Sequence, residues 1–268
     1  MQTLSKTTNK WHESNAKLKS REIEILVKYF KDTPQFENVL EVGAGNCSQS
    51  KSLSLLVNKN LVSVDLNADR LNSGEKIDTQ TLIVADAEQL DKVGFNMKFD
   101  LIFSSNVLEH LPNVKKCLDS SHAISNDDAY YVHILPNPTW RFFATVFYYP
   151  VKVRNVISRL FKHKEPQAKS SWGNNIKSSS KKVSRLSRLL PPVHGVSNNL
   201  FAEFLAFRKS SWLNTFKSSG YVVVDVLPGP ISTGYGLGFD YLKPILERLG
   251  VSTEYIYVLR KEENAREV

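Results

Sequence analysis

Short apolar segments alternate with longer polar or amphipathic segments through the first half of this 268-residue chain. Each apolar segment has the length of a buried strand, and each intervening segment is long enough for a helix. Such alternation is typical of βαβ units, whose strands form a parallel sheet. The expected strands are 38–42, 61–67, 81–87, 99–106 and 129–135, followed after a long interruption by 221–228 and 254–262.

The interruption divides the expected sheet into two parts. We predict one domain with an N-terminal helix over 10–33, a core over 35–136 and 208–262, and an inserted segment over 137–207. A hydrophobic content of 41% is ample for the buried core of such a domain.

The positive charge of the chain is concentrated in the inserted segment. The formal net charge is +8, and residues 141–190 contain twelve Lys and Arg against one acid, Glu165. The rest of the chain is slightly acidic, with 23 basic and 26 acidic residues. A basic segment suits an anionic partner, such as a membrane surface, an anionic substrate or a nucleic acid.

Cysteine usage and hydropathy indicate the compartment. Cys47 and Cys117 are too few for a disulfide framework and show no metal-ligand spacing, which fits a reducing environment. The N-terminal segment lacks the apolar core of a signal peptide, and no apolar run reaches the ~18 residues of a membrane-spanning helix. We expect a cytoplasmic protein whose membrane contact, if it has any, is peripheral.

The loop after the first expected strand contains the sequence Glu-Val-Gly-Ala-Gly, residues 41–45. In doubly wound sheets this loop faces the crevice in which ligands bind. Glycine at positions 43 and 45 permits positive φ and lets a ligand approach the main chain closely. A dinucleotide fingerprint would need a small residue at position 48, and Ser48 beside the bulkier Cys47 is a poor match. The loop therefore favours a different ligand.

Acidic residues end the next two expected strands. Asp65 or Asp86 alone would most often be a turn or helix-cap residue, but their joint occurrence favours a shared role. These features resemble, in order and spacing, the four cofactor motifs of class I S-adenosylmethionine-dependent methyltransferases. The motifs lie at 41–45, 64–66, 85–90 and 99–111. The family usually has a third glycine in the first motif, where this chain has Cys47.

The resemblance implies a fold and a cofactor. The fold would be a Rossmann-like α/β domain with a seven-stranded, mostly parallel sheet, helices on both faces and an antiparallel final hairpin. A basic helical insertion would follow the fifth strand. The cofactor would be S-adenosyl-L-methionine, and the product S-adenosyl-L-homocysteine.

The same resemblance implies which residues contact the cofactor. Main chain of the glycine loop would approach the methionyl and ribose groups, and Glu41 would hold the loop or, through water, the amino group. Asp65 would accept hydrogen bonds from both ribose hydroxyls, Asp86 would accept one from the adenine amino group, and Asn106 would lie beside the methyl-transfer point. The implied set is Glu41, Gly43, Ala44, Gly45, Asp65, Leu66, Asp86, Ala87 and Asn106.

Two histidines are candidates for the acceptor site. A hydroxyl acceptor needs a base as well as alignment with the methyl group, and histidine suits that role. His110 follows the fourth strand, where a structural role is an equal alternative. His194 lies in the inserted segment, in a stretch that resembles bacterial methyltransferases of surface-polysaccharide and lipid-linked sugar pathways; loop packing is its alternative. We expect no metal site, because Asn106 stands where ubiquinone-type O-methyltransferases have a further carboxylate beside a pair like Glu109 and His110.

The start of the inserted segment has the composition of an interfacial helix. Apolar residues between 153 and 161 fall on helical spacing among basic residues, and six aromatic residues precede them between 140 and 149. Such a helix can lie on an anionic membrane, which would place the contact within 140–190. The alternative is a lid that packs its aromatic residues on the domain and leaves its lysines in water.

The sequence therefore predicts S-adenosylmethionine-dependent O-methylation of a small molecule, a sugar or a lipid-linked saccharide. An RNA-directed methyltransferase is the alternative among enzymes, although nucleic acid is the less favoured partner because no Pro-Pro-aromatic motif follows the fourth strand. A catalytically silent cofactor-binding scaffold is the alternative outside enzymes. The acceptor atom and the oligomeric state are left open.

Overall fold

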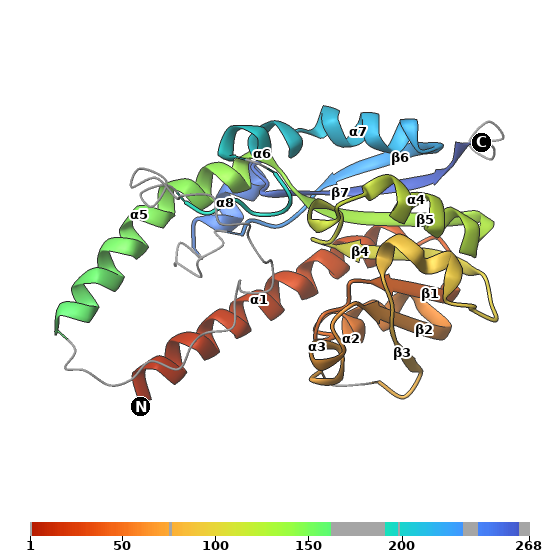
Figure 1. Ribbon diagram of the computed structural model, residues 1–268, viewed down its shortest axis with the longest axis horizontal. Coiled ribbons are helices and arrows are strands. Elements are labelled where there is room, and N and C mark those ends of the chain that lie inside the picture. Colours follow the sequence, from red (N-terminus) through yellow and green to blue (C-terminus); the bar gives the residue numbers. More distant parts are fainter. Residues whose placement is uncertain (1, 75–76, 162–190, 198, 233–240, 263–268) are drawn as a thin grey trace.

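A seven-stranded sheet with helices on both faces forms the centre of the computed structural model (Figure 1). The structure describes residues 2–74, 77–161, 191–197, 199–232 and 241–262, without the side chains of 2–14 and 154–161. The strands are β1 (Phe36–Val42), β2 (Val57–Asp65), β3 (Gln80–Val84), β4 (Phe99–Ser105), β5 (Ser125–Pro136), β6 (Tyr221–Pro228) and β7 (Glu254–Lys261).

The strand order is β3-β2-β1-β4-β5-β7-β6. The first five strands are parallel to one another, and β7 is antiparallel to both β5 and β6. The predicted Rossmann-like sheet and its antiparallel final hairpin are therefore confirmed. The order reverses between β1 and β4, so a ligand crevice is expected beyond the carboxyl ends of these two strands.

Eight α-helices and three short 3-10 helices lie among the described residues. The α-helices are α1 (Gln2–Tyr29), α2 (Ser50–Leu53), α3 (Ala68–Asn72), α4 (Val114–Ile124), α5 (Pro138–Phe161), α6 (Leu200–Ala206), α7 (Lys209–Ser218) and α8 (Lys243–Arg248). The 3-10 helices are η1 (Ser54–Leu56), η2 (Ala87–Lys92) and η3 (Leu108–His110).

Two apolar cores lie on opposite faces of the sheet, because neighbouring residues of a strand point to opposite faces. On one face, Ile23, Leu26 and Phe30 at the end of α1 pack with residues such as Val39 of β1. The other core contains Leu40 of β1 together with buried residues of α4 and α7. Both cores are continuous across β1 and β4, which fixes the carboxyl ends of these strands relative to the surrounding helices.

The observed strand ends differ from the predicted ones where local capping or exposure decides them. β2 begins at Val57 rather than at 61. Its first residues pair with β1 although they are not buried and most of them are polar, so the apolar pattern of the sequence did not include them. β3 ends at Val84 rather than at 87, because the side chain of Asp86 caps η2. The inserted segment carries α5 and α6, and Pro150 lies within α5.

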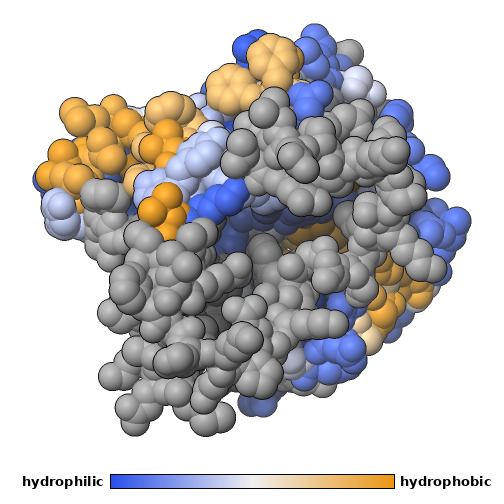
Figure 2. Space-filling view, turned by 60° about the vertical axis from the view of Figure 1, so that its left-hand side comes forward, coloured by the Kyte–Doolittle hydropathy of each residue, from blue (hydrophilic) through white to orange (hydrophobic). Residues whose placement is uncertain are grey.

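α5 carries an apolar stripe that faces solvent. Phe142, Val146, Tyr149 and Val153 are 59%, 45%, 43% and 56% exposed, and their spacing places them on one side of the helix. In Figure 2 the left-hand side of Figure 1, where α5 lies, is turned toward the viewer, and exposed apolar patches are seen on this side of the molecule. No helix of the described part of the chain is long and apolar enough to cross a membrane. The basic residues at 162–190 lie outside the described residues.

Candidate active site

The glycine loop turns sharply away from the end of β1. Gly43 and Gly45 have φ of +73° and +57°, in the left-handed region that favours glycine. The backbone amides of Gly43 and Ala44 donate to the carbonyl of Val64, at 2.8 and 3.0 Å. A Cβ atom at position 43 would collide with the side chain of Val107, so this glycine is required by close packing as well as by its φ.

Cys47 supplies the turn that glycine usually supplies at the third position of the motif. Its φ is +59°, an uncommon conformation for a residue with a side chain. The thiol is 4% exposed, and burial raises its pKa. A protonated, buried thiol is a poor nucleophile, so the role of Cys47 is structural.

Asp65 lies against the glycine loop, and its predicted contact with the ribose hydroxyls stays a prediction. One carboxylate oxygen accepts from the amide of Gly45 at 2.8 Å, and the other accepts from the amide of Asn67 at 2.8 Å. The neighbouring Leu66 is 72% exposed. The end of β2 and the loop after β1 therefore form one surface.

Asp86 makes the contacts of a helix cap. Its carboxylate accepts from the amide of Glu88 at 2.9 Å and from the side-chain amide of Gln89 at 3.1 Å, and Ala87 begins η2. These contacts leave Asp86 partly exposed at the end of β3, two strands away from β1. An adenine contact by Asp86 and Ala87 stays a prediction.

Glu41 points into the protein behind the loop. Its side chain accepts hydrogen bonds from the hydroxyls of Ser50 and Ser63, both at 2.6 Å, and the residue is 2% exposed. Burial raises the pKa of Glu41, and the two serine hydroxyls oppose that shift. These contacts join the end of β1 to α2 and β2, and the predicted role of Glu41 at the loop or the amino group stays a prediction.

The end of β4 is set by an unusual backbone conformation at Asn106, where φ is +54°. The amide of Asn106 donates to the carbonyl of Ile134 in β5 at 2.9 Å. Non-glycine residues in this region carry strain and often lie at functional sites. η3 follows directly and presents Glu109 and His110 beyond the sheet.

A buried polar network joins α1 to the same end of β4. The ammonium of Lys19 donates to Glu22 at 2.9 Å and to the hydroxyl of Ser105 at 2.6 Å, and Gln49 donates to Glu22 at 2.8 Å. The sequence reasoning missed this network. Its only sequence signal is the presence of polar residues within the apolar face of the helix, next to Ile23 and Leu26.

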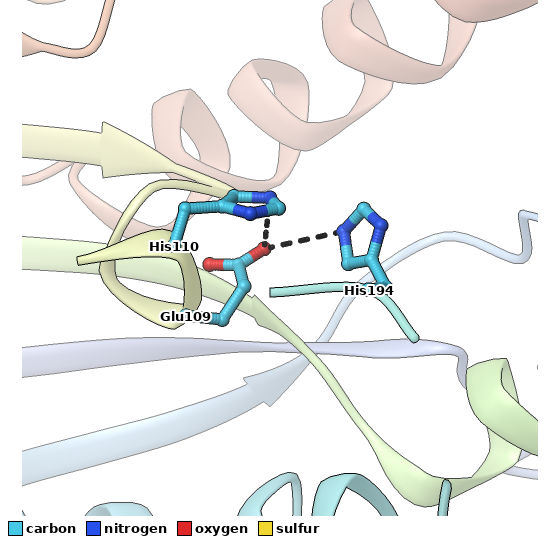
Figure 3. A group of neighbouring side chains, drawn as sticks. All are labelled: Glu109, His110 and His194. Carbon is cyan, nitrogen blue, oxygen red and sulfur yellow. Dashed lines mark ion pairs between the residues drawn. The ribbon is translucent and has the colours of Figure 1, made fainter. Parts of the chain in front are cut away.

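Glu109 and His110 of η3 come together with His194, which lies far away in the chain (Figure 3). Oε1 of Glu109 lies 3.8 Å from Nε2 of His110 and 3.9 Å from Nε2 of His194. The ring centroids of the two histidines are 4.6 Å apart. We call these three residues the Glu-His-His cluster. Each offers one potential metal ligand, and these ligand atoms lie within 4.8 Å of one another.

The cluster differs in exposure and charge from an ordinary surface group. The side chain of Glu109 is 1% exposed, whereas those of His110 and His194 are 44% and 30% exposed. Burial raises the pKa of Glu109 to about 8. Burial, then the neighbouring His110 and Arg141, lowers the pKa of His194 to about 4, and burial also lowers the pKa of His110. The protein alone therefore favours uncharged side chains here.

The segment that carries His194 is fixed by a buried ion pair. Nε of Arg141 in α5 lies 2.9 Å from Oε2 of Glu203 in α6, and both side chains are buried. The other oxygen of Glu203 accepts from the backbone amide of His194, and Arg141 also donates to the carbonyl of Pro192 at 3.1 Å. Neither residue was among the predicted site residues, because nothing in the sequence pairs them.

A backbone contact attaches the same segment to Glu109. The amide of Val196 donates to the carbonyl of Glu109 at 3.2 Å. Gly195, at φ +87°, allows this approach, because a Cβ atom there would meet that carbonyl oxygen at 2.5 Å. The ring of Trp140 lies 4.7 Å from that of His194, at an angle of 51° to it.

Residues 40–132 match the family described as methyltransferase domain, and this range contains all four motifs. No curated protein matches the chain. The plantazolicin methyltransferase BamL, solved with a triazolic desmethylPZN analog and SAH, has 14% sequence identity and a TM-score of 0.55 over 96% of this chain and 90% of its own.

Two further solved structures have the same fold. An S-adenosylmethionine-dependent methyltransferase from Clostridium acetobutylicum has 11% identity and a TM-score of 0.51, over 91% of this chain and 92% of its own. The magnesium protoporphyrin IX methyltransferase ChlM from Synechocystis, with bound SAH, has 11% identity and a TM-score of 0.50, over 90% and 83%. At these identities the likeness shows the fold.

The family match and the observed sheet together define the class of the protein. Residues 40–132 form a methyltransferase domain, and together with the fold this match indicates an S-adenosylmethionine-dependent methyltransferase whose methyl donor is S-adenosyl-L-methionine. The glycine loop and the strand-end carboxylate of Asp65 fit that donor. The contacts of Asp65 with the ribose hydroxyls and of the loop main chain with the methionyl group stay predictions.

Proposed function

We propose that the enzyme methylates a hydroxyl group of a small molecule, a sugar or a lipid-linked saccharide, and that the Glu-His-His cluster binds this hydroxyl. The cluster is the observation that supports the proposal. It follows β4 directly, next to Asn106, at the edge of the sheet where the donor binds in this fold. It offers hydrogen-bond acceptors to a neutral hydroxyl, and its side chains favour the uncharged state.

The transfer itself needs few protein groups. The oxygen of the acceptor attacks the methyl carbon, the carbon–sulfur bond breaks, and its electron pair returns to sulfur to give S-adenosyl-L-homocysteine. The enzyme aligns the two reactants and excludes water. The cluster adds binding of the hydroxyl and assists the loss of its proton, a contribution of about 10²–10⁴ in rate for such groups.

We further propose that the segment 137–207 acts as a lid over the acceptor. Arg141, Trp140 and His194 all belong to it, and all lie at or next to the cluster. The lid would admit the acceptor by moving relative to η3. The names of two structural relatives, a plantazolicin methyltransferase and a magnesium protoporphyrin IX methyltransferase, describe dissimilar acceptors, and we attribute the choice of acceptor in this chain to the lid.

A labelling experiment tests the hydroxyl proposal. Cell extract is incubated with the enzyme and S-adenosylmethionine that carries a labelled methyl group, and the product is identified by mass spectrometry. We expect an O-methyl ether on a small molecule or saccharide. His194→Ala should lower its formation by about 100-fold and leave the affinity for S-adenosylmethionine within twofold. Label on RNA would contradict the proposal and support an RNA-directed enzyme instead.

The exposed stripe of α5 supports a proposed contact with an anionic membrane, where a lipid-linked acceptor would be found. Phe142, Val146, Tyr149 and Val153 would enter the interface, and the twelve basic residues of 141–190 favour anionic lipid, apart from Arg141, which is used in its ion pair. The cytoplasmic location stays a prediction.

Flotation with vesicles that contain anionic phospholipid tests the membrane contact. The triple variant Phe142→Ser, Val146→Ser, Tyr149→Ser should lose most vesicle binding. Phe201→Ser is the matched control, because Phe201 is 71% exposed on α6, outside the stripe. Equal flotation of the triple variant and the wild type would remove the proposed contact.

A further inference from the structure

The carboxyl group of Glu109 is buried without a hydrogen-bond partner among the described residues. Neither of its oxygens has a hydrogen-bond partner among the described residues, although its side chain is 1% exposed. The two imidazole nitrogens, at 3.8 and 3.9 Å, are too far away for hydrogen bonds. Lys19 is a nearby buried cation, but its ammonium is bonded to Glu22 and Ser105. Buried polar groups without partners are rare and require an explanation.

We infer that the Glu-His-His cluster is a binding site for a divalent transition-metal ion, with Zn²⁺ as the best match. Two imidazole nitrogens and one carboxylate oxygen form a donor set that suits Zn²⁺ and similar ions better than Mg²⁺, which prefers oxygen ligands. A metal site here departs from the sequence-based expectation of none, which depended on Asn106 standing where a further carboxylate would be. His194, which completes the donor set in its place, lies far away in the chain.

The spacing of the three atoms fits an ion between them after small side-chain movements. Zn²⁺ lies about 2.0–2.2 Å from such ligands, so ligand atoms around a tetrahedral ion are about 3.4 Å apart. The observed separations from Glu109 are 3.8 and 3.9 Å. All three ligand atoms lie within 4.8 Å of one another, so the partly exposed imidazole rings would turn toward the ion to reach its coordination distances.

The backbone around the cluster is held in place by contacts that a metal site needs. The amide of Val196 is bonded to the carbonyl of Glu109, and the amide of His194 is bonded to the buried Glu203. Trp140 packs against the ring of His194. Metal ligands that are fixed by surrounding contacts bind more tightly, because less ordering is required on binding.

The inferred ion gives the proposed function a more specific chemistry, and this step rests on that function. Three protein ligands leave a coordination position open, where the acceptor hydroxyl can bind. Coordination strongly lowers the pKa of a bound hydroxyl group. The O–H bond then breaks with its proton passing to water, and the O–CH₃ bond forms as the S–CH₃ bond of the donor breaks.

Metal binding is measurable without any acceptor. The full chain is treated with a chelator and titrated with Zn²⁺ by calorimetry, and with Co²⁺ while the visible absorption is recorded. We expect one equivalent of either ion per chain, and Co²⁺ bands typical of four or five ligands. His110→Ala, His194→Ala and Glu109→Gln should each weaken Zn²⁺ binding at least tenfold.

Two variants control for unspecific binding at other side chains. His122→Ala removes an imidazole from α4, and Glu37→Gln removes a half-exposed carboxylate at the start of β1. Both should bind Zn²⁺ like the wild type. Affinity for S-adenosylmethionine and the circular dichroism spectrum, measured on every variant, show whether it is folded.

The outcomes separate the metal inference from the proposed function. A folded enzyme that binds S-adenosylmethionine but no Zn²⁺ or Co²⁺, or whose metal binding is unchanged in the cluster variants, overturns the inference and leaves hydroxyl methylation standing. A chain that binds one Zn²⁺ through the cluster but methylates only amines or RNA overturns the proposed function and leaves the metal site standing.

Discussion

The cofactor side of the sheet, with the glycine loop and Asp65, and the proposed acceptor side, with the Glu-His-His cluster, are constructed in different ways. On the cofactor side, the glycine loop and Asp65 follow adjacent strands and meet through main-chain hydrogen bonds, such as that from Gly45 to Asp65. On the acceptor side, Glu109 and His194 come from distant segments and are brought together by the buried pair of Arg141 and Glu203. The first side depends on backbone shape, and the second depends on long-range side-chain pairing.

This difference indicates how each side can change. Main-chain contacts to a donor that is the same in every reaction need few particular side chains. An acceptor site made of side chains on an inserted segment can be rebuilt without disturbing the sheet. We therefore expect substitutions on the two sides to separate donor binding from acceptor chemistry.

Loss of the ion pair on the acceptor side should have the largest effect on stability. Arg141→Ala leaves the buried carboxylate of Glu203 without its partner, which costs about 3–5 kcal/mol in the free energy of unfolding. Denaturant unfolding measures this cost, and calorimetry should show donor affinity within threefold of the wild type.

The double variant Arg141→Met, Glu203→Leu sharpens the same test, since it removes both charges. It should regain most of the stability but not the methyl-transfer activity, because the backbone amide of His194 loses its acceptor. Lys115→Ala, which breaks an exposed pair with Asp119, is the control and should change stability by about 0.5 kcal/mol or less. Wild-type stability in Arg141→Ala would show that the pair does not hold the lid.

On the cofactor side, Gly43→Ala should have the next largest effect. The new methyl group meets Val107, and the positive φ adds strain, for a combined cost of about 2–4 kcal/mol. Donor affinity should fall more than tenfold. Gly94→Ala is the matched control, because Gly94 has φ +74° but no atom within 4 Å of an added Cβ. Equal effects in both variants would mean that only strain matters at position 43.

Asp65→Asn tests the side-chain contribution to donor binding. It should weaken S-adenosylmethionine binding by about 1–3 kcal/mol, since a charged acceptor becomes neutral and the amide can keep only one of the two main-chain contacts, with Gly45 or with Asn67. Calorimetry gives the change, with the exposed Asp69→Asn as control. If donor affinity did not change, the only role of the Asp65 side chain would be to hold the glycine loop in place.

Glu41→Gln should have the smallest effect and a characteristic pH dependence. Burial raises the pKa of Glu41, so the wild type loses stability as pH rises above about 4.5, where the unfolded carboxyl ionises. The side-chain amide that replaces the carboxyl group in the variant keeps an acceptor oxygen for Ser50 and Ser63, and it does not ionise near Asp65. The loss of stability with rising pH should therefore be shallower in the variant than in the wild type. At pH 7 the change should be within about 1 kcal/mol. A steeper slope in the variant would contradict this account, and a large loss of donor affinity would restore Glu41 as a direct cofactor contact.

Much of the sheet could be predicted because its signals are local. Apolar strands such as 38–42 are separated by helix-length segments, and β6 was predicted with both ends correct at 221 and 228. The ends of β2 and β3 were less accurate, because exposed pairing and the cap at Asp86 set them. Capping depends on a few side-chain hydrogen bonds that compete closely with one more strand residue.

The sequence by itself determined the class of enzyme, its donor and the main-chain shape of the donor loop, because these depend on residue types at short, fixed spacing. The tertiary structure alone decided that His194 joins Glu109 and His110, that Arg141 is buried with Glu203, and that α1 brings Lys19 and Glu22 to the end of β4. Contacts between distant segments depend on how helices pack on the sheet, and that packing leaves no periodic signal in the order of residues.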